Sequence, residues 1–591
     1  MKGAPPARTQ LGKVGQAGEV GQAGEVGQVG EAPVGVGSPS LLTRAWFQPL
    51  RVHAAVLLIV LFALLPLMSP GGSFSSDEGA YALQVEALDD GSWKYDYKAA
   101  PYDPEGRYFP IYLSTQSDSG YFPYVKHPAY PLLLQGARRL AGPSLGLHLL
   151  ALLGTLGTAV AAWLLAAELD PRLGRPAFWL AATGPALVNG FLIWAHAPSA
   201  ALGGLALLGA ARIAGRGFTP LATAGVSTSL VAGVLLRSEG LLFAAAVAIA
   251  LAWVRHRKRA HAGRLTPLLL AVPAVVATGV EQRWVSSIIG ARFATDGVRR
   301  GNLPYLEGRL SGASHELFHS PGQHPLAALP MLLALALVVG LGFLALRRWG
   351  PGSRRDLTVL ASGTIILLVV RLALSRYAPV TGLFAAWPLG LLGLLLVRWR
   401  RAEATAALLG GSVALFAGAV LLTQYPEGGA TEWGGRFLSP ALAPLAVLAA
   451  VGLSAAVAAV PRPQRRAATS LLVTVAVAFA AFGLTSVGSE RARIGRVAQA
   501  IARHPAQVTV TTGAFLPRAA WSINDRVAWM QAERGELVTL IAHLRAQGSR
   551  DVAVVLPGHI PPSELSPFPT VEERPEPDLS AAGLRLFLAR A

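Results

Sequence analysis

The sequence has no cysteine, only six lysines, and few charged residues of either sign. Without cysteine the chain can form neither a disulfide nor a thiolate metal site, and it has no cysteine nucleophile. Only 14% of the 591 residues are charged, whereas soluble chains average about 25%. These charges are too few to cover several soluble domains, so the composition excludes a soluble enzyme, a coiled coil and a wholly disordered chain.

Hydrophobic residues instead make up 52% of the chain, and the mean hydropathy is +0.46. Apolar runs of roughly 20 residues recur, and each is long enough to cross a bilayer core of about 30 Å. We predict an all-α polytopic membrane protein with about 13 transmembrane helices and a small C-terminal α/β domain. The predicted spans are 52–69, 143–167, 176–195, 197–213, 219–236, 240–254, 265–289, 326–346, 356–374, 379–397, 405–423, 437–460 and 467–486.

Arginine and lysine gather in every second loop between these spans, whereas the other loops hold fewer bases and more acids. Because basic loops stay in the cytoplasm, the N-terminus is predicted inside and the C-terminus outside. This clustering accounts for most of the net charge of +18, so a nucleic-acid-binding surface is not needed to explain that charge. The 45 arginines against six lysines are typical of GC-rich coding, which suggests a bacterial source. The predicted location is therefore the bacterial plasma membrane. The first three basic loops contain Arg172, Arg175, Arg212, Arg216, Arg255, Arg257, Lys258 and Arg259.

The two ends of the chain lie outside the predicted membrane helices. Residues 1–45 contain the repeats GQAGEV, GQAGEV and GQVGEA, which cannot bury a core, so we predict a disordered cytoplasmic tail. The transmembrane domain covers 46–486, with a first extracytoplasmic loop at 70–128, and an extracytoplasmic α/β domain covers 487–591. The expected elements of that domain are a strand at Val508–Thr512, a helix at Glu533–Ala546 and a strand at Asp551–Leu556.

Two adjacent carboxylates, Asp77 and Glu78 in the segment SDEGAY, follow the outer end of the first span. Acids beside a membrane are costly unless they are solvated or used, and a carboxylate there can act as general base on an acceptor hydroxyl. The alternative is a helix N-cap, with Ser76 or Asp77 capping a short interfacial helix that starts at Glu78. Both interpretations stay open on the sequence alone.

The same loop ends in KHPAYPLLL, in which Lys126 and His127 precede a second interfacial helix at 129–140. A cation at the membrane surface can neutralise a phosphate. The alternative is a snorkelling lysine beside a capping histidine.

Arg237 and Glu239, in LLRSEGLL, lie where two apolar runs meet on the outer side. Ionisable groups at such a depth are functional candidates, although a structural ion pair at a hairpin is the alternative. His196 lies between two spans and is either a pore residue or part of a capped turn, and we expect the capped turn. Glu281 and Arg283 lie two residues apart on one predicted helix, so they do not face each other, and we assign them no role.

Arg436 begins a late membrane helix from the outside, in GGRFLSPALAPL. The two glycines before it let a ligand approach the backbone, and arginine can grip a phosphate through two parallel hydrogen bonds. The alternative is an interface anchor. The sequence has no nucleotide-binding glycine motif and no paired-histidine zinc motif, so neither nucleotide-driven transport nor zinc chemistry is supported.

Together these segments resemble the GT-C class of polytopic glycosyltransferases. The nearer likeness is to the bacterial branch that is similar to protein O-mannosyltransferases and the lipid A aminoarabinose transferase, and it covers roughly residues 50 to 460. The chain departs from that branch at Ser238, where proline is frequent, and at Ala195–Pro198, where several members have an acid. The matching motifs are Asp77–Glu78, Lys126–His127–Pro128, Arg237–Ser238–Glu239–Gly240 and Gly434 through Pro440.

The resemblance implies that an acceptor hydroxyl attacks a polyprenyl-phosphate-linked sugar on the extracytoplasmic side, with lipid phosphate as leaving group. It implies Asp77 as general base with Glu78 beside it. It requires no cofactor, although a divalent cation is compatible with it. The acceptor is a glycan, lipid or protein hydroxyl in a membrane setting, without nucleic acid. The other implied residues are Lys126, Arg237 and Arg436 for the donor phosphate, and His127, Tyr130 and Glu239 for substrate binding.

Two other functions remain open on the sequence. A polytopic transporter or lipid flippase would also have many helices and scattered charges, but transporters tend to place ionisable groups at mid-membrane within repeated halves. A noncatalytic subunit that kept the GT-C fold is the second alternative, because His196 stands where an acid is expected.

Overall fold

The structure is a computed structural model, and two predicted spans, 326–346 and 356–374, lie outside the residues that it describes, as does the Gly-rich repeat. The chain divides into two compact units, Met1–Pro49 and Leu50–Ala591. The described residues are 41–69, 71–110, 115–117, 120–123, 127–257, 266–289, 312–313, 315–318, 382–399, 403–423, 433–513, 515–561, 565 and 570–590.

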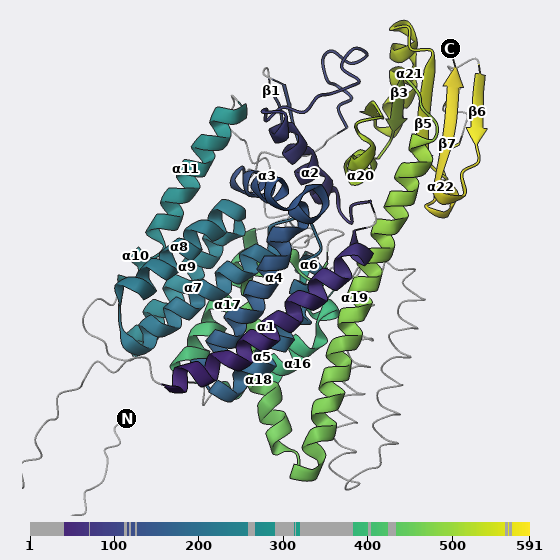
Figure 1. The fold of residues 1–591 in the computed structure, drawn as a ribbon. Helices are drawn as coiled ribbons and strands as arrows, with labels where there is room; N and C mark the ends of the chain where they lie inside the picture. Colours follow the sequence, from purple (N-terminus) through teal and green to yellow (C-terminus); the bar gives the residue numbers. More distant parts are fainter. Residues whose placement is uncertain are drawn as a thin grey trace, which may run out of the picture. The chain divides into compact units, whose positions relative to one another are not determined.

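Long apolar helices form most of the described part of the chain before residue 503 (Figure 1). Their buried faces meet in one large core of Leu, Ala, Phe and Trp side chains. These helices are α1 (Leu41–Met68), α4 (Pro143–Ala167), α7 (His196–Arg216), α8 (Pro220–Leu236), α9 (Glu239–Arg257), α11 (Val272–Ile289), α17 (Ala404–Thr423), α18 (Leu442–Ala459) and α19 (Arg465–Ala502).

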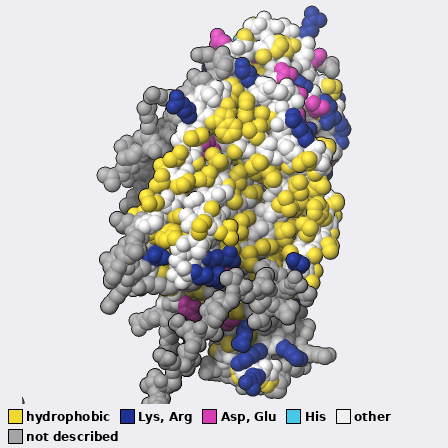
Figure 2. Space-filling view, turned by 60° about the vertical axis from the view of Figure 1, so that its left-hand side comes forward, with side chains coloured by type: hydrophobic (Ala, Val, Ile, Leu, Met, Phe, Trp, Pro, Cys, Tyr) yellow, Lys and Arg dark blue, Asp and Glu magenta, His cyan; other side chains and the backbone are white. Residues whose placement is uncertain are grey.

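Eight helices among the described residues are long and apolar enough to cross a membrane. Several carry large hydrophobic side chains on their outer surface, such as Ile59, which is 68% exposed, and Val280, which is 61% exposed. Figure 2 shows a band of hydrophobic side chains on one face, with Lys and Arg above and below it. Such a band suits contact with lipid, so the chain is a multi-pass membrane protein. The count of about 13 spans stays a prediction.

The span predicted at 176–195 is not one helix. α5 (Gly174–Ala182) stops before Gly184, and Pro185 begins the short α6 (Pro185–Asn189). The backbone before a proline avoids the α region, and Gly184 is extended, with φ −82° and ψ −167°. Turns after α6 then bring the chain to the first residue of α7. Two other predicted spans are also interrupted. The span at 265–289 contains α10 (Thr266–Leu269) followed by α11, and the span at 379–397 contains α15 (Leu383–Ala386) followed by α16 (Pro388–Leu396).

The first loop contains α2 (Ser76–Asp89) and the hairpin of β1 (Thr115–Ser117) with β2 (Gly120–Phe122), and α3 (Ala129–Ala141) follows it. Both helices were expected at the membrane surface. α3 leaves apolar side chains exposed, but α2 is almost entirely buried. Gly79 explains the close packing of α2, because a Cβ atom there would lie 1.7 Å from the Arg518 carbonyl oxygen.

The C-terminal residues form a five-stranded mixed sheet in the order β4-β3-β5-β7-β6. β3 is parallel to β4 and β5, whereas β7 is antiparallel to β5 and β6. The strands are β3 (Val508–Thr511), β4 (Trp529–Gln531), β5 (Asp551–Pro557), β6 (Thr570–Arg574) and β7 (Leu584–Arg590), and the helices are α20 (Phe515–Ala519), α21 (Leu537–Ala546) and α22 (Pro577–Ala581).

The sheet is joined to the helical part in two ways. α19 runs for 38 residues without a break, which at 1.5 Å per residue exceeds a bilayer core of about 30 Å, so the boundary expected at 487 falls inside a helix. Tyr97 and Tyr108 of the first loop also complete the core on one face of the sheet. The Gln531 amide donates to the Tyr108 carbonyl at 2.8 Å. The sheet and the first loop therefore form one packed body.

Candidate functional site

Five chain segments meet at one end of the helical bundle. They are the start of α2, the start of α7, the end of α8, the start of α9 and the 3₁₀ turn Arg436–Ala441 that leads into α18. The antiparallel course of the helices returns these ends to the same level. The sequence-predicted residues Asp77, Arg237, Glu239 and Arg436 all lie on these segments.

Asp77 and Arg436 form an ion pair across this end of the bundle. The Arg436 Nη1 atom donates to Asp77 Oδ2 at 3.0 Å. The side chains of Asp77 and Arg436 keep 22% and 15% exposure, so a ligand can still reach them. Two consecutive glycines with positive φ, Gly434 at 67° and Gly435 at 69°, turn the chain so that Arg436 points back to α2. Only glycine adopts this backbone readily.

Glu78 lies beside Asp77 in the sequence but occupies a different environment. Its side chain is fully buried and pairs with Arg491 of α19 at 3.2 Å. Its Oε2 atom also accepts from the Phe74 amide at 2.7 Å, and its Oε1 atom accepts from the Ile193 amide at 2.8 Å. Glu78 thus fixes the start of α2 by a capping box with Ser75. The helix cap is therefore Ser75, and not Ser76 or Asp77 as the capping alternative supposed.

Arg491 was not singled out from the sequence, because it follows the last apolar run as one of several arginines. In the structure it is buried and donates to the carbonyl oxygens of Met68 at 2.8 Å, of Phe191 at 2.6 Å and of Gly72 at 3.1 Å. A buried charge with this many partners ties α19 to the ends of three other segments.

Arg237 and Glu239 form a second, more deeply buried pair. The guanidinium donates twice to the carboxylate, at 2.7 and 3.1 Å. The Arg237 Nη1 atom also lies 3.5 Å from Nδ1 of His196. The positive charge of Arg237 is close enough to that of Arg436 for the two to repel. The expected capped turn at His196 is not formed, because the N-cap residue of α7 is Ala195 and no side chain caps the helix.

His127 lies 3.0 Å from a carboxylate that the sequence analysis left without a role, Glu281 of α11. Their side chains are 12% and 4% exposed. His127 is not a helix cap, because the N-cap residue of α3 is Pro128 and no side chain caps the helix. Lys126, the third predicted phosphate cation, lies outside the described residues.

Tyr130 is fully buried and packs edge to face on Tyr81, with ring centroids 5.0 Å apart. Burial, followed by the nearby Glu78 charge, raises the pKa of Tyr130 well above its usual value, so the hydroxyl keeps its proton. Among the described residues this hydroxyl has no hydrogen-bond partner. It can therefore donate to a ligand that reaches it.

In the part of the chain that the structure describes, no group of three His, Asp or Glu side chains is placed to hold a metal ion. The two adjacent acids also point to different partners, Asp77 to Arg436 and Glu78 to Arg491.

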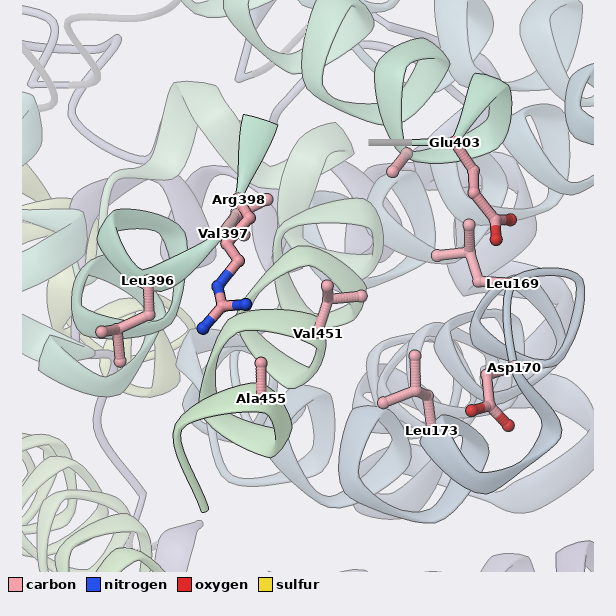
Figure 3. Close-up of a pocket in the computed structure, with 10 residues that line it drawn as sticks. Leu169, Asp170, Leu173, Leu396, Val397, Arg398, Glu403, Val451 and Ala455 are labelled. Carbon is pink, nitrogen blue, oxygen red and sulfur yellow. The ribbon is translucent and has the colours of Figure 1, made fainter. Parts of the chain in front are cut away.

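A separate hollow of about 230 Å³ lies at the other end of the bundle. Leu169, Val451 and Ala455 line it, together with Asp170, Arg398 and Glu403 (Figure 3). It lies beyond the C-terminal ends of α4 and α16, away from the paired arginines. Its lining is mainly apolar and shares no residue with the candidate site.

No protein-family model matches the sequence, and no curated protein matches it. Solved structures do match. ArnT from Cupriavidus metallidurans in the apo state matches with a TM-score of 0.51 and 13% identity, over 93% of this chain and 98% of that chain. The same protein bound to undecaprenyl phosphate gives 0.48 and 14% identity, over 91% and 97%.

Archaeal oligosaccharyltransferase AglB from Archaeoglobus fulgidus, in complex with an inhibitory peptide and a dolichol-phosphate, matches with a TM-score of 0.44 and 14% identity, over 87% of this chain and 70% of that chain. ArnT and AglB are both GT-C glycosyltransferases. Since the apo ArnT match extends over nearly the whole of both chains, this protein has the GT-C fold that its sequence motifs resemble.

Proposed function

We propose that this chain moves a sugar from a polyprenyl-phosphate donor to an acceptor hydroxyl at the membrane surface. The observation that carries the proposal is the grouping of two arginine–carboxylate pairs, Asp77 with Arg436 and Arg237 with Glu239, at one end of an apolar helical bundle. A lipid-linked phosphate needs cations beside an apolar surface, and the acceptor needs a base.

In the proposed reaction the acceptor oxygen attacks the anomeric carbon of the sugar. The bond from that carbon to the phosphate oxygen breaks, the lipid phosphate leaves with the electron pair, and the acceptor proton passes to Asp77. Arg436 offers five N–H donors in a planar fork, so it can hold Asp77 with one Nη and the phosphate with its other donors. Arg237 and Lys126 supply further positive charge.

The remaining predicted residues take supporting roles in this proposal. Glu78 holds the start of α2 in position and thereby aims Asp77. Glu239 orients Arg237 through two hydrogen bonds. His127, held by Glu281, and Tyr130 contact the substrate. The proposed steps are assigned to these side chains alone.

The test is turnover by the purified full-length protein with a panel of radiolabelled polyprenyl-phosphate sugars and with wall glycans, lipids and proteins as acceptors. We expect at least one donor to release lipid phosphate in step with sugar transfer. Transport of lipid without cleavage would instead indicate a flippase, and binding without either would indicate a noncatalytic subunit.

We further propose a bacterial plasma membrane location with the N-terminus in the cytoplasm and the sheet of the C-terminal part outside. The native chain has no cysteine, so single cysteines can be labelled cleanly. Gln547 and His256 are both exposed. An impermeant thiol reagent applied to intact cells should label Gln547→Cys and spare His256→Cys, and the reverse pattern would overturn the orientation.

A further inference from the structure

His196 is a buried residue that has no role in the reaction proposed above. It is the first residue of α7 and is 1% exposed. Its ring packs on Trp194, with centroids 4.2 Å apart. It lies within electrostatic reach of both Arg237 and Arg436, which places it among the cations of the candidate site.

The hydrogen bonding of the ring fixes where its proton lies. Arg237 Nη1 is 3.5 Å from His196 Nδ1, and a guanidinium can only donate. Nδ1 must therefore accept, and in a neutral ring the proton is then on Nε2. The His196 Nε2 atom is buried and has no partner among the described residues.

A buried N–H without a partner costs stability, so its presence calls for an explanation. Ser199, one turn further along α7, also has a buried hydroxyl without a partner in the described part of the chain. Ser199 borders a small hollow of about 10 Å³, roughly the space that one water needs. His196 does not line that hollow, so a water there does not serve it.

We infer that His196 Nε2–H is a hydrogen-bond donor to the phosphate of the lipid-linked sugar, and this rests on the proposed function. An N–H donor that lies with two guanidinium groups is matched best by an anion, because an anion can accept hydrogen bonds from all of them. The positive end of the α7 dipole adds to the same preference.

The experiment measures binding of undecaprenyl phosphate and of uncharged undecaprenol to the purified full-length protein. His196→Phe keeps a ring against Trp194 but removes both nitrogens, and it should weaken undecaprenyl phosphate binding by about 10-fold to 100-fold. Undecaprenol binding should change less than about twofold. His196→Gln retains an N–H donor and should bind undecaprenyl phosphate within about threefold of wild type.

Ser199→Ala is the matched control, because it removes the other unpartnered polar group on α7 and should alter neither affinity. If His196→Phe does not fold, His196→Leu carries the same prediction. Equal losses of affinity for the two lipids would assign the ring a packing role and overturn the inference. Unchanged binding of both lipids would also overturn it. If wild type transfers sugar while His196→Phe binds undecaprenyl phosphate normally, only this inference fails. If wild type neither transfers sugar nor binds undecaprenyl phosphate, the proposed function fails.

Discussion

Asp77 and Arg436 are 359 positions apart in the sequence and form a hydrogen-bonded ion pair of 3.0 Å in the structure. The pair joins the segment after the first span to the segment before a late one. It places the proposed base next to a proposed phosphate cation, which is the arrangement that a transfer from a lipid phosphate to a hydroxyl requires. In the free protein each group also neutralises the other.

Replacing Arg436 by lysine should weaken donor use although the charge is kept. Lysine is a single point charge, whereas the guanidinium can hold Asp77 and a phosphate at once. We expect the donor concentration for half-maximal rate to rise by roughly 10-fold or more, measured by donor titration at saturating acceptor. Arg398→Lys, at the opposite end of the bundle, is the control and should match wild type. Equal donor dependence in all three proteins would remove Arg436 from the site.

Arg491→Leu should destabilise the protein strongly. It leaves Glu78 buried without its cation and leaves three carbonyl oxygens without their donor, and breaking such a buried pair costs about 3–5 kcal/mol. Arg493→Leu is the control, because Arg493 is 37% exposed and pairs with Glu490 on its own helix, and it should cost at most about 1 kcal/mol. The measurement is thermal unfolding in detergent. Equal unfolding temperatures for the two variants would contradict this account.

Glu86 of α2 should make stability fall as the pH rises from about 4.5 to about 7. Burial, reinforced by Asp525, Asp89 and Asp90 and opposed by Arg138, raises the pKa of Glu86 to about 7. The folded state therefore binds this proton more tightly than the unfolded state. The resulting stabilisation is complete at pH values below the pKa of Glu86 in the unfolded chain, and it is lost as the pH rises through the pKa of Glu86 in the folded protein. The change is at most roughly 3 kcal/mol.

Glu86→Gln cannot lose a proton, so its unfolding temperature should depend less on pH over this interval than that of wild type. The comparison of the two proteins at pH 5 and pH 8 isolates Glu86 from the other titrating groups. Identical pH dependence would show that Glu86 titrates normally in the folded protein.

Local sequence signals predicted where helices and charged residues lie along the chain. The apolar runs gave most of the described helices, and the charged residues at their ends include both members of the two arginine–carboxylate pairs. The partners could not be predicted, because no local periodicity connects Asp77 with Arg436 or His127 with Glu281. Such pairings depend on how the helices pack in three dimensions.

The different roles of Asp77 and Glu78 show another limit of sequence reasoning. Adjacent residues on a helix point about 100° apart, so one carboxylate meets Arg436 while the other meets Arg491. The break at Gly184–Pro185 could have been read from the proline rule. The burial of His196 could not, because it depends on Arg237 and Trp194 packing around the start of α7.

The most direct test of the central claim is a pair of measurements on Asp77→Asn, turnover and undecaprenyl phosphate affinity. The amide keeps the size of the side chain but cannot take the acceptor proton, so turnover should fall by roughly 10²–10⁴. Affinity for undecaprenyl phosphate should hold or increase, because Arg436 loses its competing carboxylate. This combination of lost turnover and retained binding is what the account predicts. Near-normal turnover, or binding lost together with turnover in a folded variant, would contradict it.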